Sequence, residues 1–248
     1  MTPILLVHGA WQSTACWDEV ISILGSLGKR GVAVTLTGLG SDTGHLNPQV
    51  RLSTHIEDVI RAVDSGGGPF VLVGHSYGGM VVTGACEQRP DKVLGTVYVD
   101  GFVPQDGQSA QQLLPQAIAQ TFESMASEQG DGWRLPGGDF LLDVWGTRDL
   151  AHRAKIRQDL SDFTIRCFEE VLHLPFGQAR NKPRGYIASG LKHEYPARTV
   201  FETFVNEARA GGWLLMQVDA GHTCEVEKPN EVARAISAFV DRVGATAA

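Results

Sequence analysis

The chain has 248 residues, of which 43% are hydrophobic and 20% are charged, and its formal net charge is −7 at pH 7. This length and composition are enough to bury an ordinary hydrophobic core. They predict one globular domain with room for an insertion, and they exclude the disordered, fibrous and membrane-spanning classes. The negative charge, without any run of Lys or Arg, argues against nucleic acid or an anionic membrane surface as a partner.

The cysteines and the first residues bear on the cellular setting. The cysteines are widely spaced and form no C-x-x-C pattern, which indicates neither a zinc site nor a disulfide framework: Cys16, Cys86, Cys167 and Cys224. The opening residues, MTPILLVHGAW, run directly into a short apolar strand without the charged region or the cleavage site of a signal peptide. We therefore expect a cytoplasmic protein.

The first hundred residues alternate between short apolar runs and helical patterns. We expect strands at residues 4–8, 32–36, 70–74 and 93–100, and helices at 17–28, 54–64 and 79–89. The alternation returns later, with strands at 184–189 and 213–218 and helices at 198–211 and 229–243. Runs of Val, Ile and Leu without polar alternation are typical of strands that helices cover on both faces. The sequence therefore predicts an α/β fold with a mostly parallel sheet.

The rhythm changes between residues 103 and 182, where no clean strand is visible. Helical patterns occur at 108–126 and 152–174, and a Gly- and Pro-rich stretch occupies 130–140. Because a structureless loop of that length is rare in a compact domain, we predict a mostly helical insertion over the sheet. The predicted division is an α/β core of residues 1–102 and 183–248, with a helical cap of residues 103–182.

The first chemical signal is VLVGHSYGG, residues 71–79, in which G-x-S-x-G lies between a strand and a helix. A sharp strand-to-helix turn strains the backbone of its central residue, so small residues must flank it, and Gly74, Gly78 and Gly79 supply them. The turn lifts the Ser76 hydroxyl to a helix N-terminus, where free N–H groups favour negative charge. A Gly-rich loop with an incidental serine is the plainer alternative. We predict that Ser76 is the nucleophile.

Two other turns provide partners for this serine. HGAW, residues 8–11, follows the first strand, and we expect the amides of Ala10 and Tyr77 to form the oxyanion hole that acyl transfer requires. DAGHT, residues 219–223, places His222 on a loop after the last strand, from which it can act as general base. The other histidines have no partner implied by their position: His8, His45, His55, His75, His152, His173 and His193.

Taken together, these motifs resemble the α/β-hydrolase superfamily over nearly the whole chain. LLVHGAWQSTACW, AVTLTGLG, LSTHIEDV and VLVGHSYGGMV are similar to the branch that includes plant methylesterases and hydroxynitrile lyases and bacterial pyrethroid and lactone hydrolases. The resemblance implies a helical cap after the sixth strand of the superfamily, hydrolysis without a cofactor, and a triad in the chain order Ser, acid, His. Ser76 and His222 follow that order.

The acid departs from the pattern of this branch. In many relatives it follows the next strand in a pattern like YIxCxxD, but YIASGLKHE places Lys192 there, and a lysine cannot accept the imidazole N–H. Glu194 lies two residues further on and serves as the acid if the loop is longer by two residues. Asp100 ends the preceding strand in VYVDGFVP. The carboxyl ends of parallel strands converge on one side of the sheet, so a carboxylate there can reach the imidazole. Asp is also common in turns, which is the plainer interpretation of this residue. We predict Asp100 as the acid, with Glu194 as the alternative and Asp219 as a turn residue.

The function that these residues predict is a serine hydrolase cleaving a carboxylic ester or lactone through an acyl-enzyme. The alternatives are a C–C or amide bond hydrolase, a non-catalytic ligand receptor, and a hydroxynitrile lyase, although Thr223 stands where such a lyase is expected to have a lysine. We expect a small hydrophobic substrate and no metal or cofactor, and a homodimer is left open. Six aromatic residues are candidates for the pocket, although at least half are equally typical of cap core: Trp11, Phe102, Trp133, Phe140, Trp145 and Phe176.

Overall fold

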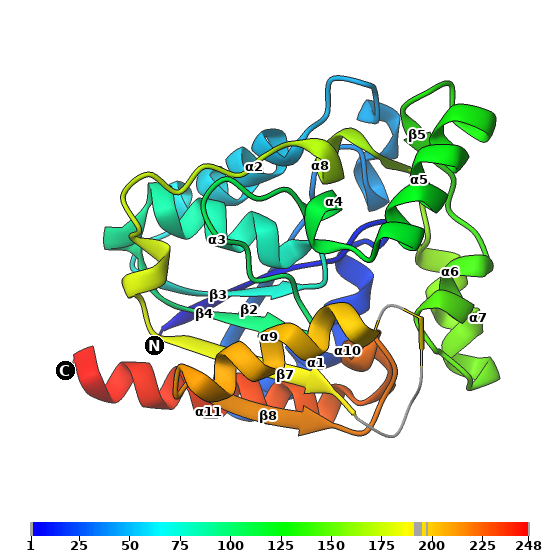
Figure 1. Cartoon of the computed structure of the whole chain (residues 1–248). Helices are drawn as coiled ribbons and strands as arrows, with labels where there is room; N and C mark the ends of the chain where they lie inside the picture. Colours follow the sequence, from blue (N-terminus) through cyan, green and yellow to red (C-terminus); the bar gives the residue numbers. More distant parts are fainter. Residues whose placement is uncertain (1, 191–194, 197, 248) are drawn as a thin grey trace.

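A computed structural model describes residues 2–190, 195, 196 and 198–247. Within these ranges, six strands form a parallel sheet in the order β2-β1-β3-β4-β7-β8. Their bounds are β1 (Pro3–Val7), β2 (Arg30–Val34), β3 (Phe70–His75), β4 (Val93–Val99), β7 (Arg184–Ser189) and β8 (Leu214–Val218). Figure 1 shows this sheet at the centre of the molecule. The predicted α/β fold with a mostly parallel sheet is confirmed.

Helices cover both faces of the sheet. One face carries α1 (Asp18–Ser26) and α11 (Pro229–Ala247), and the other carries α2 (Leu52–Ser65), α3 (Gly78–Gln88) and α9 (Arg198–Ala210). The shorter helices are η1 (Thr14–Trp17), η2 (Gly40–His45), η3 (Pro90–Lys92), η4 (Ala179–Asn181) and α10 (Cys224–Glu227). No helix in these ranges has the combined length and hydropathy that crossing a bilayer requires.

The two faces of β4 show why the strands read as continuous apolar runs. Gly95 faces α11, where a side chain at that position would meet the ring of Phe239. Tyr98 points to the opposite face, and its hydroxyl hydrogen-bonds Thr83 of α3. Because successive residues of a strand alternate between faces, a strand covered on both sides needs apolar or small residues at almost every position.

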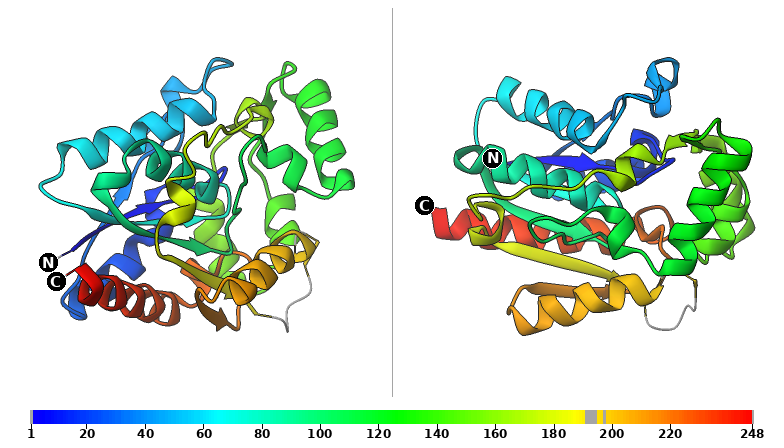
Figure 2. Two further views of the ribbon diagram at one scale, coloured as in Figure 1. Left: turned by 60° about the vertical axis from the view of Figure 1, so that its left-hand side comes forward. Right: turned by 45° about the horizontal axis from the view of Figure 1, so that its top comes forward.

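Most of the segment between β4 and β7 lies beyond the carboxyl ends of the strands, and its last residues return over α2 and α3. It contains α4 (Ala110–Leu113), α5 (Gln116–Gln129), β5 (Arg134–Leu135), α6 (Phe140–Val144), α7 (Leu150–Asp159), β6 (Phe163–Thr164) and α8 (Arg166–Glu169). Figures 1 and 2 show α5, α6 and α7 past the arrowheads of the strands, whereas both chain termini lie at the opposite end of the sheet.

This segment differs from the sequence-based expectation in two ways. The helical pattern at 108–126 is two helices, because Pro115 precedes α5 and its ring cannot continue α4. The pattern at 152–174 ends as a helix at Asp159 and continues as β6 and α8. β5 and β6 pair antiparallel where no strand is visible in the sequence, since two-residue strands carry no periodicity.

Candidate active site

The ends of β3 and β4 bring two of the predicted site residues together. His75 is paired with Val99 in the register of these parallel strands, so Ser76 and Asp100 are the residues that follow on each. The Ser76 amide donates a hydrogen bond to the Val99 carbonyl at 3.2 Å, and the Phe102 amide donates to the Ser76 carbonyl at 3.1 Å. The two turns therefore share backbone hydrogen bonds just past the sheet edge.

The backbone around these turns is strained. Ser76, Asp100 and Trp11 have φ values of 51°, 41° and 63°, in the left-handed region that residues with a side chain rarely adopt. The close approach of the turns also requires glycine, since a Cβ atom at Gly79 would lie 2.2 Å from the carbonyl oxygen of Phe102. Strain of this kind is concentrated at functional sites, where surrounding contacts enforce it.

A chain of hydrogen bonds joins Ser76, His222 and Asp100. The distance from Ser76 Oγ to His222 Nε2 is 2.9 Å, and that from His222 Nδ1 to Asp100 Oδ2 is 2.7 Å. A carboxylate only accepts, so Nδ1–H donates to Asp100 and Nε2 accepts the serine hydroxyl proton. The structure thus brings these three predicted residues into contact, whereas Lys192 and the alternative acid Glu194 lie outside the described residues.

His222 is held on three sides. Its backbone amide donates to the Trp145 carbonyl at 2.9 Å, which ties the loop to the inserted segment. Its ring stacks on Phe201 of α9, with centroids 4.7 Å apart and planes 25° apart, and lies 4.8 Å from the ring of His75. The side chain is 2% exposed. These contacts fix the imidazole between the serine and the carboxylate.

Asp100 has partners that the sequence did not indicate. The Tyr195 hydroxyl donates to Oδ2 at 2.7 Å, and the Ser189 amide donates to Oδ1 at 3.2 Å. Burial raises the pKa of Tyr195, so its hydroxyl stays protonated and acts as a donor. Tyr195 belongs to the loop where the acid of many relatives would lie, but spacing alone gives no sign that its hydroxyl reaches back to β4.

The two amides predicted for the oxyanion hole lie beside the serine. Gly9 precedes Ala10 and packs so closely that a Cβ atom on it would be 3.1 Å from Ser76 Cβ. Tyr77 is the residue after the serine and caps α3. In the described part of the chain, neither amide donates to a protein acceptor. Both N–H groups are therefore available to a ligand at Ser76.

A cavity of about 40 Å³ lies above Ser76, beneath the inserted helices. Its lining is mostly apolar and comes from the oxyanion turn, the elbow, the turn after β4, the end of α4, α5, α6, α8, α9 and the His222 loop: Ala10, Trp11, Gln12, His75, Ser76, Phe102, Leu114, Ile118, Phe122, Val144, Trp145, Phe168, Phe201 and His222. The predicted pocket residues Trp11, Phe102 and Trp145 are among them.

The other three aromatic residues predicted for the pocket are not among these lining residues. Phe176 is 76% exposed, in the segment that returns to the core. Trp133 lies in the turn before β5, and Phe140 begins α6, whose opposite end supplies Val144 to the cavity. The sequence could not show which end of each short helix faces Ser76.

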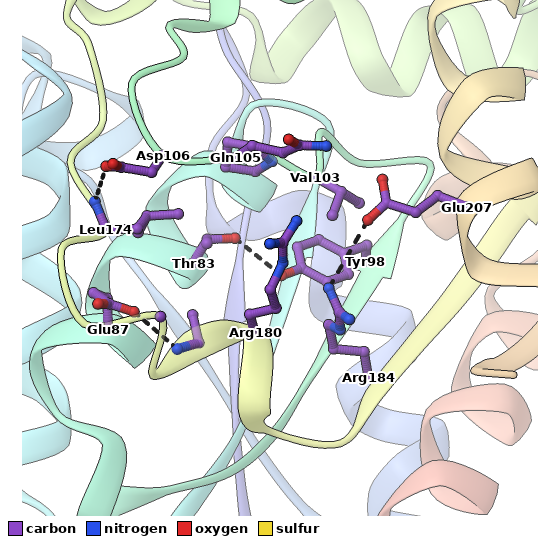
Figure 3. Close-up of a pocket in the computed structure, with 13 residues that line it drawn as sticks. Thr83, Glu87, Tyr98, Val103, Gln105, Asp106, Leu174, Arg180, Arg184 and Glu207 are labelled. Carbon is purple, nitrogen blue, oxygen red and sulfur yellow. Dashed lines mark hydrogen bonds and ion pairs between the residues drawn. The ribbon is translucent and has the colours of Figure 1, made fainter. Parts of the chain in front are cut away.

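A second cavity, of about 70 Å³, lies between α3 and α9 where the chain leaves and rejoins the sheet (Figure 3). Two of its carboxylates hold backbone amides: Glu87 accepts from Phe176 and Ala179, and Asp106 accepts from Leu174. These bonds fasten the returning segment to α3 and to the residues after β4. The lining of this cavity shares no residue with the first, so the two are separate features.

Comparisons with known proteins agree with this architecture. A family model described as "Alpha/beta hydrolase family" matches residues 4–235. A carbendazim hydrolyzing esterase from Nocardioides sp. (strain SG-4G) is 32% identical, over 96% of this chain and 100% of its own length. Methylesterase 8 of Arabidopsis thaliana is 33% identical, over 76% of this chain and 72% of its own length. The crystal structure of a pyrethroid hydrolase from Sphingobium faniae JZ-2 has a TM-score of 0.77 at 23% identity, covering 97% of each chain.

The chain therefore belongs to the α/β-hydrolase family, and the resemblance drawn from its motifs is confirmed. The likeness to the solved structure concerns the fold. In the ranges that the structure describes, no group of three or more His, Cys, Asp or Glu side chains is arranged to hold a metal ion.

Proposed function

We propose that this protein is a serine hydrolase that cleaves a carboxylic ester or lactone through an acyl-enzyme, with residues 103–182 acting as a lid. The observation that carries the proposal is the hydrogen-bond chain from Ser76 through His222 to Asp100, which opens onto an apolar cavity. The esterase names of the relatives that align over most of the chain support the same reaction class.

In the proposed mechanism, each group acts on a defined atom. His222 Nε2 takes the Ser76 proton as Oγ attacks the carbonyl carbon, and the amides of Ala10 and Tyr77 hold the oxyanion. His222 then protonates the leaving alcohol, and a water molecule activated by the same nitrogen hydrolyses the acyl-enzyme. Asp100 stays ionised throughout, which keeps the hydrogen on Nδ1 and stabilises the imidazolium.

The cavity supports a compact acyl group. A single water needs about 10–15 Å³ of such space, so the cavity above Ser76, at about 40 Å³, accepts a group the size of an acetyl or propionyl. Its apolar lining favours a hydrocarbon surface over a charged one. A larger alcohol or acyl group requires displacement of the inserted helices.

The residue after the general base argues against cyanohydrin chemistry. Thr223 is buried, and its hydroxyl donates to Glu227 at 2.9 Å and contacts the Thr147 hydroxyl. It is thus a neutral residue engaged in the loop, not a cation that could hold cyanide. Ester hydrolysis needs no such cation, because the leaving alcohol is protonated by His222.

The test is hydrolysis of p-nitrophenyl acetate and butyrate by the wild type and by Ser76→Ala. We expect the variant to lose at least about 10⁴-fold in kcat, since the nucleophile and its acyl-enzyme are removed. Ser65→Ala, at the end of α2 and away from the site, serves as the control with unchanged kcat. Equal turnover by Ser76→Ala, or no turnover of any ester or lactone by the wild type, would show the proposal to be wrong.

A further inference from the structure

Glu225 is a fully buried carboxyl group on α10, directly behind the active site. One of its oxygens, Oε1, accepts a hydrogen bond from Gln12 Nε2 at 2.9 Å. The other, Oε2, has no hydrogen-bond partner among the described residues and lies 3.5 Å from His75 Nε2. An ionised carboxylate in this setting is costly, because one oxygen has lost water without gaining a donor.

Gln12 connects this carboxyl group to the oxyanion turn. Gln12 Oε1 accepts from the Gly9 amide at 3.1 Å and lies 2.8 Å from His75 Nδ1. The Gly9 N–H identifies this atom as the amide oxygen, because an amide nitrogen in its place could not accept. His75 Nδ1 must therefore carry a hydrogen and donate to Gln12.

His75 connects the same cluster to the loop of the general base. Its other ring nitrogen, Nε2, lies 2.9 Å from the carbonyl oxygen of His222, which can only accept. A neutral imidazole has a single N–H, whereas two acceptors face this ring. Neutral His75 beside an ionised Glu225 therefore leaves the cluster one hydrogen short.

We propose that His75 and Glu225 hold one additional proton between them, and that this proton joins the oxyanion turn to the loop that carries the general base. Glu225 is then a positioning residue for hydrolysis, and in this respect the inference rests on the proposed function. The proton supplies either a second ring N–H on His75, which serves the His222 carbonyl, or an O–H on Glu225, which faces His75 Nε2. When the proton is lost, Oε2 faces that nitrogen as a carboxylate oxygen without a donor in the described part of the chain. The buried cluster then also carries a net negative charge.

The electrostatics place this proton mainly on the carboxyl group at neutral pH. Burial raises the pKa of Glu225 to about 8, and the charges of Glu227 and Asp100 act in the same direction. Burial lowers the pKa of His75, and the neighbouring His222 lowers it further. This distribution favours catalysis, because the two imidazole rings are 4.8 Å apart and a charged His75 would oppose the imidazolium that forms on His222.

The two thiols near Glu225 stay protonated at neutral pH. The thiols of Cys16 on η1 and Cys224 on α10 have pKa values that burial raises well above the ordinary range. Among the described residues, no lysine or arginine contributes to the pKa of Glu225. Ionisation of the cluster on the alkaline side is therefore a property of the His75–Glu225 pair.

The first arm of the test is the pH profile of kcat for p-nitrophenyl acetate between about pH 6.5 and 10. We expect the kcat of the wild type to fall by about tenfold per pH unit above a midpoint near 8. Glu225→Gln cannot ionise and keeps both hydrogen-bonding positions, so it lacks this fall and keeps kcat at neutral pH within about threefold. Glu227→Gln, on the same short helix but without contact to His75, is the matched control and retains the fall.

The second arm measures the cluster without catalysis. The Gly9 amide donates to Gln12, so its ¹H–¹⁵N resonance in the wild type shifts with the same midpoint as kcat and stays constant in Glu225→Gln. The inference is wrong if Glu225→Gln shows the alkaline fall of the wild type, or if Gly9 in the wild type does not titrate between about pH 7 and 9. If the wild type turns over no ester, but its Gly9 resonance titrates and that of Glu225→Gln does not, the proposed function fails and the shared proton stands.

Discussion

At the scale of single residues, the position of Asp100 follows from the neighbour relation of two strands. β3 and β4 are adjacent and parallel, with His75 opposite Val99, so the residues after them leave the sheet side by side. Asp100 thereby reaches His222 from the strand next to the nucleophile, and Tyr195 comes from the loop after the next strand, β7. The carboxylate accepts one hydrogen bond from His222 and two more, from the Tyr195 hydroxyl and the Ser189 amide.

Asp100→Asn tests the acid directly. We expect kcat to fall by about 10⁴-fold, because the amide can donate to Nδ1 and thereby favours the wrong imidazole tautomer. Asp106→Asn, in the same turn region but bonded to the Leu174 amide, is the control with nearly unchanged kcat. If Asp100→Asn keeps the kcat of the wild type while Glu194→Gln loses it, the triad acid is Glu194.

Tyr195→Phe tests the support of the carboxylate. Loss of a hydrogen bond to a charged group is worth about 1.5–3 kcal/mol, so we expect kcat to fall by about 10- to 100-fold while KM changes little. Tyr186→Phe is the matched control, since that buried hydroxyl donates to the Gly101 carbonyl and not to Asp100. Equal kcat values for both variants would contradict a specific role for Tyr195.

Residues that belong to a local pattern could be predicted from the sequence, and residues that depend on distant contacts could not. Ser76 lies in G-x-S-x-G between a strand and a helix, and His222 follows the last strand. Gln12, Tyr195 and Glu225 are polar residues in ordinary turns or helix starts. Only the fold shows that Gln12 contacts Glu225 and that Tyr195 contacts Asp100, because that depends on which strand ends meet.

At the scale of elements, the inserted helices define how much space Ser76 has. α5 contributes Ile118 and Phe122 to the cavity, and α6 ends at it with Val144. The Trp145 carbonyl also binds the His222 amide, so the same segment closes the cavity and holds the base. A change in α5 is therefore expected to alter acyl selectivity, whereas a change at Trp145 would disturb both properties.

Ile118→Ala tests the first of these expectations. Removal of the side chain enlarges the cavity, and we expect kcat/KM for the butyrate ester relative to the acetate to rise by about 3- to 10-fold. Met125→Ala on the same helix does not line the cavity and is the control with an unchanged ratio. An unchanged ratio in Ile118→Ala would mean that acyl length is selected elsewhere.

The helices and strands could be predicted from the sequence better in the sheet than in the inserted segment. Each strand of the sheet overlaps its predicted range. β3, which is buried at every residue, is the clearest case, because a strand covered on both faces gives an unbroken apolar run. In the inserted segment, the patterns at 108–126 and 152–174 combined separate elements. The first contains a break at Pro115, whose ring ends α4, and the second contains the two-residue strand β6, which carries no periodicity.

At the scale of the whole molecule, the polar groups of the site all lie at the carboxyl ends of the strands. The oxyanion turn follows β1, the elbow follows β3, Asp100 follows β4, and the His222 loop follows β8. This is the edge at which open parallel sheets place their ligands. Such a site buries ionisable side chains inside an otherwise apolar core. This burial lowers the free energy of unfolding by an amount that depends on pH.

The buried histidines and Glu225 act on stability in opposite directions. Burial lowers the pKa of His8 to about 4 and also lowers those of His55 and His75, so below their ordinary pKa of 6.5 the unfolded chain binds more protons than the native one. The free energy of unfolding therefore rises with pH up to about 6.5. Glu225, with its pKa raised from 4.5 to about 8, keeps a proton in the native state that the unfolded chain releases, which lowers the free energy of unfolding over that interval.

Because the effect of the three histidines fades as the pH rises through 6.5, whereas that of the carboxyl group lasts to about pH 8, stability should be greatest near pH 6.5 to 7. From there to about pH 8 we expect the free energy of unfolding to fall, by at most about 1.4 kcal/mol per pH unit because a single proton is released, as measured by urea unfolding of the wild type at a series of pH values. Glu225→Gln removes the released proton and should abolish this fall, whereas Glu231→Gln, at an exposed position of α11, should retain it. A fall of equal slope in Glu225→Gln would assign the alkaline loss of stability to other groups.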